Sequence, residues 1–337
     1  MNPESINIDF ANNNDILITS ANGSSRLVGK HAIISGTSSN STVHGGFMLL
    51  AKPYINSYFL NASMSSNWYK KFIDLYVAGG NGAIGNLSKT DLDNQLVHVP
   101  KEREIIKIGE LFKNLDNLIT LHQRKYDNLV KVKKSLLEKM FPKNSSNVPE
   151  IRFKGFVDAW EQRKLGECFV ERKESMPNGE LISVTINDGI KKFSELNRHD
   201  NSNENKSKYK KVCVGDIAYN SMRMWQGASG FSPYEGIVSP AYTILSPIKD
   251  AVDSKCISYL FKRQDMLYIF QKNSQGITSD NWNLKYPALS NIEIKVSNSI
   301  IEQKKIATFL SNLDNLITLH QHKELKRRKD KNGHLRW

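Results

Sequence analysis

The sequence predicts an α/β (α+β) protein in which two similar globular modules alternate with two long helices, as a pseudo-two-fold internal repeat. First, the decamer NLDNLITLHQ occurs twice, at residues 114–123 and 312–321, an offset of 198 positions. Second, a similar order of turn, acidic residue, short apolar strand and glycine-containing loop precedes each copy. Third, a length of 337 residues allows two domains of ordinary size.

The two modules follow one plan. Residues 14–29 (NDILITSANGSSRLVG) predict a strand that ends in a polar loop, and residues 215–230 (GDIAYNSMRMWQGASG) repeat it. Farther along, VHGGFMLL and VSPAYTIL each predict a buried strand, followed by a helix, a polar loop, a short helix and a strand. The modules differ more than the helices do, which is typical of modules that read different targets while the helices do one common job.

The first long helix carries a coiled-coil seam between two prolines, Pro100 and Pro142. Its seam positions alternate three and four residues apart, with a one-residue slip before the last two: Phe112, Leu115, Ile119, His122, Tyr126, Leu129, Leu136 and Met140. About 40 residues at about 1.5 Å each make a rod of roughly 60 Å. A rod of this length is typical of a spacer.

Composition indicates a soluble protein with a polyanionic partner. Apolar residues make up 39% of the chain and charged residues 24%, and no apolar run approaches the roughly 18 residues of a membrane span. The opening MNPESINIDF has two acidic residues and no basic one, unlike a signal peptide, so we expect a cytoplasmic protein with no membrane partner. The net charge of +13 suits nucleic acid, although a merely soluble basic protein stays an alternative.

The three cysteines predict neither a disulfide framework nor a metal site. Cys168, Cys213 and Cys256 lie more than 40 residues apart, with no CxxC pair. We interpret them as small apolar residues of the core. No metal or cofactor site is therefore expected in this chain.

Four motifs, in this order along the chain, resemble the DNA specificity (S) subunit of type I restriction-modification systems. They are GAIGNLSKTDLDNQLVHVP (82–100), LLEKMFPK (136–143), VPEIRFKGFVDAWEQRKLGE (148–167) and EQKKIATFLSNLDNLITLHQ (302–321). The resemblance implies two target-recognition domains, each reading half of a split DNA site through the major groove. It also implies two long conserved antiparallel helices that set the unread spacer and dock two methyltransferase subunits, through which restriction subunits join.

The resemblance further implies that this chain catalyses nothing, so that S-adenosylmethionine, ATP and Mg²⁺ belong to partner subunits. It assigns residues 1–100 to a first recognition domain, which is incomplete at its N-terminus, and 101–146 to the first spacer helix. Residues 147–300 become the second recognition domain, and 301–337 a short second spacer helix with a basic tail. Double-stranded DNA is the expected ligand.

Candidate DNA contacts follow from side-chain chemistry. Asn and Gln pair with adenine and Arg with guanine, which favours the loop after the second module's strand: Asn220, Arg223, Trp225 and Gln226. A polar, basic loop over residues 197–211 offers phosphate contacts from Lys206, Lys208, Lys210 and Lys211, or is simply solvated. The matching first-module loop holds Ser20, Asn22, Arg26 and Lys30. Polar loops after the helices add Asn81, Asn273, Gln275, Asn281 and Lys285.

The repeated decamer supplies the candidate partner-docking residues. A pseudo-symmetric pair of helices can bind two copies of one partner, which would explain why polar positions are identical in both copies. Packing for stability alone stays an alternative. The candidates are Leu115, Asp116, Asn117, His122 and Gln123 on the first helix, and Leu313, Asp314, Asn315, His320 and Gln321 on the second.

Two other classes of function stay open. Asp280, Glu293 and Lys295 have the spacing of a metal-dependent nuclease, but Gln95 and Val97 stand at the equivalents of Glu293 and Lys295. A further motif, GNGAIG (80–85), matches the dinucleotide-binding pattern, but it lacks the preceding strand and the following acidic residue of that pattern, which argues against nucleotide binding. The other class is a specificity fragment without sequence-specific DNA reading, such as a recombination reservoir that only binds partners.

The two ends of the chain depart from the family pattern. Compared with the second module, the first lacks roughly 50 residues before its first strand, so we expect an exposed edge in its sheet. After the second decamer the apolar seam is lost, and residues 323–337 carry seven basic and two acidic residues. We therefore expect the second helix to be short and its tail to fray.

Overall fold

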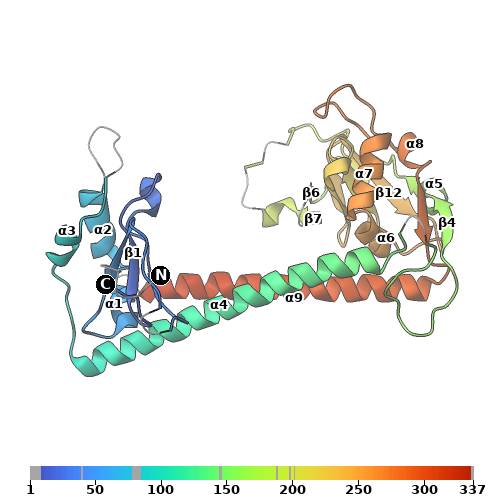
Figure 1. Ribbon diagram of the computed structural model, residues 1–337. Helices are drawn as coiled ribbons and strands as arrows, with labels where there is room; N and C mark the ends of the chain where they lie inside the picture. Colours follow the sequence, from blue (N-terminus) through green and yellow to red (C-terminus); the bar gives the residue numbers. More distant parts are fainter. Residues whose placement is uncertain are drawn as a thin grey trace. The chain divides into compact units, whose positions relative to one another are not determined.

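The computed structural model describes residues 9–38, 41–77, 85–143, 146–186, 189–196, 199–200 and 202–334. It divides into two compact units: unit 1 comprises Met1–Tyr126 with Thr318–Trp337, and unit 2 comprises Asp127–Ile317. Each unit contains one globular module and part of each long helix, α4 (Glu102–Lys139) and α9 (Ile300–His334) (Figure 1). No described helix has an apolar stretch long enough to cross a membrane.

The module of unit 1 is a small antiparallel sheet covered by helices. Its strands, β1 (Ile16–Thr19), β2 (His31–Ile33) and β3 (Met48–Ala51), have the order β2-β1-β3. The helices are α1 (Ser57–Ser63), α2 (Asn67–Tyr76) and α3 (Lys89–Asp93), with a 3-10 turn at η2 (Ser25–Leu27). Alternate β1 side chains are buried against α2, as a strand with one buried face requires.

The module of unit 2 is larger. Its main antiparallel sheet has the order β10-β9-β12-β5, with strands Ser229–Phe231, Ile217–Asn220, Tyr242–Pro247 and Phe169–Glu171. Three two-stranded sheets pair β4 (Glu161–Lys164) with β13 (Glu293–Val296), β6 (Ile182–Thr185) with β7 (Gly189–Lys192), and β8 (Lys210–Val212) with β11 (Gly236–Val238). Helices α5 (Leu165–Cys168), α6 (Ser254–Leu260), α7 (Gln264–Asn273) and α8 (Tyr286–Leu289) complete it, with short turns η4 (Phe193–Glu195) and η5 (Met224–Gln226).

The repeat predicted from sequence is present in the fold. The order β2-β1-β3 in unit 1 corresponds to β10-β9-β12 in unit 2, and helices α1, α2 and α3 follow in the order of α6, α7 and α8. Within the described residues β3 pairs only with β1, so it is an edge strand, as predicted. The prediction that VHGGFMLL is buried throughout is wrong, because β3 begins at Met48 and Phe47 before it is 73% exposed.

The two long helices pack antiparallel. In unit 1, His122 contacts His320 and Asp116 pairs with Lys331, so α4 numbers rise as α9 numbers fall. The first helix lies between Pro100 and Pro142, as expected. The prediction of a short second helix with a frayed tail is wrong, since α9 runs for 35 residues to His334. Charged pairs replace the lost apolar seam: Lys331 reaches Asp116, and the buried Glu324 pairs with Arg328.

Candidate nucleic-acid interface

In unit 2 the predicted base-reading loop follows β9 directly. The Oδ1 of Asn220 accepts a hydrogen bond from the Met222 amide at 3.0 Å, and the indole of Trp225 donates to the Met222 carbonyl at 3.2 Å. Arg223 and Gln226 are joined by a 3.3 Å hydrogen bond. Gly227, with φ +86°, lets the chain return to β10. The loop is therefore a hydrogen-bonded turn that presents Arg223 to solvent.

A second loop, between α7 and α8, packs against the first. Trp225 and Trp282 form an edge-to-face pair with centroids 5.2 Å apart, and the Leu284 amide donates to the Ser221 carbonyl at 2.8 Å. A bridge between Gln275 and Asn283 closes this loop. Its predicted members thus lie in the segment that packs against the β9 loop, with Asn281 and Lys285 exposed; Asn273, by contrast, caps the end of α7 by donating to the Ile269 carbonyl.

Trp282 was missed by the sequence analysis. The signal was present, because a tryptophan stands between two asparagines in a polar loop. Its role depends on the contact with Trp225, which is 57 residues away and which no local pattern reveals. Both tryptophans are half-buried, so the pair lies at the surface beside Arg223 and Asn281.

The four predicted lysines divide into two pairs. Lys210 and Lys211 belong to β8, so the prediction of one polar loop over residues 197–211 is wrong at its end. The reason is that Tyr209, placed in the loop by its lysine neighbours, is buried and anchors the strand. Lys210 donates to the Tyr242 carbonyl at 2.7 Å, and Lys211 pairs with Glu174 at 3.4 Å.

The contact of Lys210 places it near the loop that follows β9. Tyr242 is the register partner of Asn220 in the β9–β12 pair, so Lys210 lies at the same end of the sheet. Lys208 is exposed and Lys206 is partly buried, both before β8. Lys208 is thus the member of the group with the freest access to a phosphate.

Unit 1 has a matching site at the end of β1. The Leu87 amide donates to the Ser20 carbonyl at 2.8 Å, the same contact at the same length that Leu284 makes with Ser221 in unit 2. A cavity of about 660 Å³ opens beside it, and its lining includes Asn22, Lys30 and Phe47. The whole lining is Thr19, Ala21, Asn22, Gly23, Leu27, Lys30, Phe47, Met48 and Asn86.

The other predicted residues of this first site have different positions. Arg26 is exposed on η2, and Asn22 accepts a hydrogen bond from the Ser24 amide at 3.0 Å. Asn81 lies outside the described residues, as does most of the GNGAIG motif. Phe47 was missed because its apolar neighbours made it look like part of the strand. The structure therefore gives each unit one polar loop beside an exposed or half-exposed aromatic side chain.

The predicted docking residues include four that contact the opposite long helix: Asp116, Asp314, His122 and His320. Leu115 and Leu313 pack into the hydrophobic clusters of their units. Asp116 pairs with Lys331, and Asp314 pairs with Lys133, both at 2.5 Å. Lys133 and Lys331 are themselves 198 residues apart, so one contact occurs once in each unit. The two leucines and the two aspartates therefore have a role in packing within the chain, and their part in partner docking stays a prediction.

The two histidines of the decamers meet each other. Their Nδ1 atoms lie 3.1 Å apart, and the His122 side chain is buried. A hydrogen bond between two ring nitrogens needs a neutral acceptor. Burial lowers the pKa of both imidazoles, and the positive charge of Lys125 and Lys323 lowers it further. The two histidines thus contact each other across the helix pair, with His122 buried and His320 half-buried, and their part in partner docking stays a prediction. Gln123 is half-buried, whereas Asn117, Asn315 and Gln321 are exposed.

The proposed nuclease residues do not form a metal site. Lys295 donates to the Ser146 carbonyl at 2.7 Å, and Glu293 accepts from the Gln162 side chain at 2.5 Å. Glu293 and Lys295 are thus occupied in holding β13 to neighbouring chain segments, while Asp280 is exposed in a turn. Across the described ranges, no three His, Cys, Asp or Glu side chains are grouped so as to hold a metal ion.

The structure thus has two repeated modules joined to a pair of antiparallel helices, and each module has a polar loop beside an aromatic side chain. Residues 158–327, half of the chain, match the family described as type I restriction modification DNA specificity domain. The chain belongs to this family. It is accordingly a specificity subunit and not a catalytic one, as the motifs predicted.

A solved structure agrees with this fold. The S subunit of a type I restriction-modification system from M. genitalium is 14% identical, with a TM-score of 0.55; the match covers 97% of this chain and 83% of that chain. The HsdS subunit from Thermoanaerobacter tengcongensis is also 14% identical, with a TM-score of 0.46 and coverage of 97% and 80%. Among curated protein sequences no match was found. The predicted mixed fold of two modules with two long helices is confirmed.

Proposed function

We propose that this chain directs a type I methyltransferase to a split DNA site, with one half read by each module. The observation that supports this most directly is the repeated site: the same amide-to-carbonyl contact, Leu87 to Ser20 and Leu284 to Ser221, holds a polar loop at the end of β1 and of β9. Two copies of one loop arrangement with different side chains are what two different half-sites require.

Within this proposal the domains keep their predicted ranges. Residues 1–100 and 147–300 read DNA, and 101–146 and 301–337 form the spacer. The ligand is double-stranded DNA. The partners are two methyltransferase subunits that bring S-adenosylmethionine, and restriction subunits, joined through them, that use ATP and Mg²⁺.

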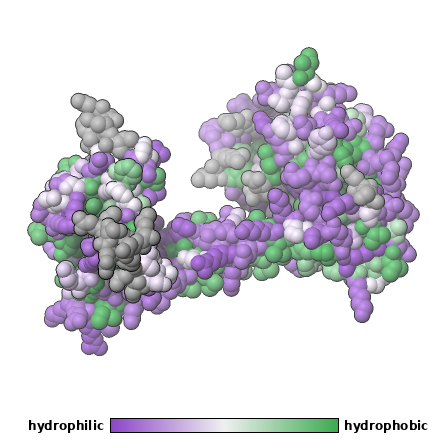
Figure 2. All heavy atoms as spheres, in the orientation of Figure 1, coloured by the Kyte–Doolittle hydropathy of each residue, from purple (hydrophilic) through white to green (hydrophobic). Residues whose placement is uncertain are grey.

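Within this proposal, exposed residues of the repeated decamers in α4 and α9 bind the methyltransferase subunits. Asn117 and Asn315 occupy the same repeat position and are exposed. Leu121 and Leu319, also equivalent, are each 45% exposed. Two equivalent apolar patches flanked by amides suit two copies of one partner. Figure 2 shows a mostly hydrophilic face on which hydrophobic residues gather in separate patches.

The test is to express the chain with its methyltransferase subunits and sequence the methylated bases. A defined split site is expected. Arg223→Ala should relax one half-site, and Asn22→Ala should relax the other half-site only. If the complex assembles but methylates no defined site, the chain is the partner-binding fragment without DNA reading. If neither variant confines its effect to one half-site, the assignment of the two loops is wrong.

A further inference from the structure

In unit 2, one continuous stretch closes both the sheet and the start of α9. We name residues 150–171 the closing segment. Arg152 forms two hydrogen bonds with the fully buried Glu302, at 2.6 and 2.9 Å, and Trp160 packs edge-to-face on Phe141. Strand β4 then pairs with β13, and β5 adds to β12. Three separate surfaces are covered by 22 consecutive residues (150–171).

Unit 1 has the same three surfaces without a cover in its described residues. Among the described strands, β3, the counterpart of β12, pairs with β1 alone. Residues 95–99 correspond to β13 with an offset of 198, yet no backbone amide of 96–99 donates a hydrogen bond to a described residue. Leu96 is 96% exposed, whereas its equivalent Ile294 is 3% exposed. Glu104, the equivalent of Glu302, is exposed and has no ion-pair partner among the described residues.

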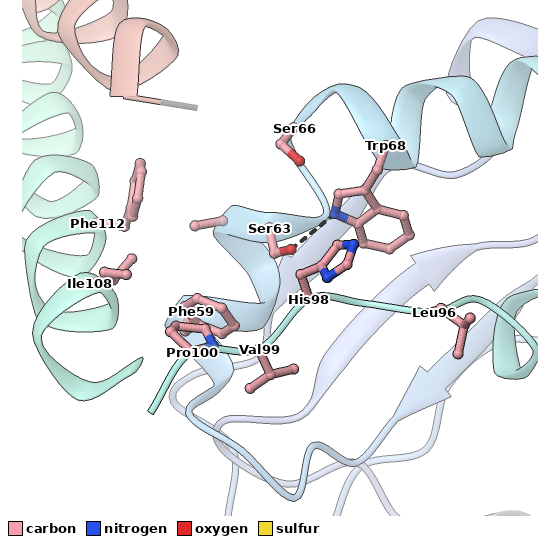
Figure 3. Close-up of a pocket in the computed structure, with 11 residues that line it drawn as sticks. Phe59, Ser63, Ser66, Trp68, Leu96, His98, Val99, Pro100, Ile108 and Phe112 are labelled. Atoms are coloured by element: carbon pink, nitrogen blue, oxygen red, sulfur yellow. Dashed lines mark hydrogen bonds between the residues drawn. The ribbon is translucent and has the colours of Figure 1, made fainter. Parts of the chain in front are cut away.

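An apolar pocket lies where unit 1 lacks this cover. It has a volume of about 490 Å³ (Figure 3). Figure 3 shows it between α4, which contributes Ile108 and Phe112, and α2, which contributes Trp68. Helix α1 contributes Phe59, Ala62 and Ser63, Ser66 follows it, and the segment before α4 adds the rest of the lining: Leu96, His98, Val99 and Pro100. Its lining is mainly apolar, and the Trp68 indole already donates to Ser63 at 2.9 Å. This site suits a large aromatic side chain.

The helix surface beside the pocket keeps the polar groups that hold the closing segment in unit 2. There, Lys305 lies 5.0 Å from the centre of the Phe156 ring, and Phe309 meets Phe153 at 5.9 Å. The unit 1 equivalents, at an offset of 198, are Lys107 and the half-exposed Leu111. With Glu104 they offer an anion for an arginine, a cation for one aromatic ring and an apolar contact for another.

We propose that this surface of unit 1 binds a segment of a separate polypeptide that has the chemistry of the closing segment. Its arginine would pair with Glu104, its tryptophan would fill the pocket, and its strands would pair with residues 95–99 and with β3. A second copy of this chain fits poorly as donor, because releasing its own segment would strip the buried Glu302 of its arginine. This proposal does not depend on DNA reading.

A labelled synthetic peptide of residues 148–171 tests it by fluorescence anisotropy against the full chain. Saturable one-to-one binding is expected. Leu96→Asp and Glu104→Lys in the chain, and Trp160→Ala in the peptide, should each weaken binding at least about tenfold. The matched control is Asp74→Lys, an exposed acidic residue of α2 outside the pocket, which should leave the affinity unchanged.

Three outcomes overturn the proposal. Absence of binding at millimolar peptide means that this surface is closed or unsuitable. Binding that Leu96→Asp leaves unchanged means that the peptide displaces the chain's own segment in unit 2. Dimers of the chain that form in sedimentation experiments and are lost in Leu96→Asp mean that a second copy is the occupant. Circular dichroism of each exposed-site variant checks that its fold is intact.

Discussion

The ion pair between Arg152 and Glu302 should be among the most sensitive points of unit 2. The Glu302 side chain is 0% exposed and Arg152 is 12% exposed, and two short hydrogen bonds join them. Arg152→Met removes the cation but keeps the aliphatic bulk of the side chain. Within the described part of the chain, the Glu302 carboxylate would then keep one hydrogen bond, from Ser297. The variant therefore leaves a buried carboxylate without its counter-charge.

The expected cost follows from that burial. Removing one member of a buried pair costs about 3–5 kcal/mol in free energy of unfolding, because the remaining charge stays desolvated. Replacing both members by apolar side chains, as in Arg152→Met with Glu302→Met, should recover most of this loss. The internal repeat supplies the control: Glu104→Gln at the exposed equivalent should change stability by less than about 0.5 kcal/mol.

Urea unfolding followed by tryptophan fluorescence measures these differences. Unit 2 contains Trp160, Trp225 and Trp282, and Trp68 reports on unit 1. A loss below about 1 kcal/mol for Arg152→Met would refute the view that this pair anchors the closing segment. If Arg152→Met and Glu104→Gln lowered the free energy of unfolding equally, the argument that this position matters in unit 2 and not in unit 1 would be refuted.

Three further predictions concern the helices and the loops. Burial lowers the pKa of His122 and His320 below 6.5, so the unfolded chain binds protons at a higher pH than the folded chain does. Unit 1 should therefore lose stability as the pH falls below about 6.5, which thermal melts would measure. Leucine at both positions should flatten this pH dependence. Asp116→Lys should cost up to about 1 kcal/mol in chemical unfolding, and adding Lys331→Asp should restore it. In the assembled complex, Lys208→Ala should weaken DNA binding equally for all sequences and lower the salt slope of the affinity by about 1.

The architecture could be predicted because the sequence contains an internal repeat and a periodic pattern of apolar residues. An identical decamer 198 residues apart, a seam with three-and-four spacing and two flanking prolines together determine two helices of one kind. The strand before each polar loop was equally clear. These are local signals, and they can be interpreted without knowing what each segment packs against.

The errors arose where distant contacts decide the outcome. Trp282 gains its place from Trp225, and Lys210 enters a strand because Tyr209 beside it is buried. The helical tail of α9 depends on Lys331 meeting Asp116, which lies 215 residues away. The prediction for Phe47 was also wrong: an apolar residue beside a strand is expected to be buried, and Phe47 is exposed.

The identity of the two decamers has its main explanation in the helix pair itself. In a self-complementary antiparallel interface, residue i of one helix meets residue j of the other, and the reverse contact occurs as well. Asp116 with Lys331 and Asp314 with Lys133 are such a pair of contacts. His122 meets its own equivalent, His320. A substitution in one decamer would disrupt one of the two equivalent contacts and leave the other intact. Packing between the helices therefore favours the same residue at both equivalent contact positions. Partner docking is needed to explain only why the exposed positions are also identical.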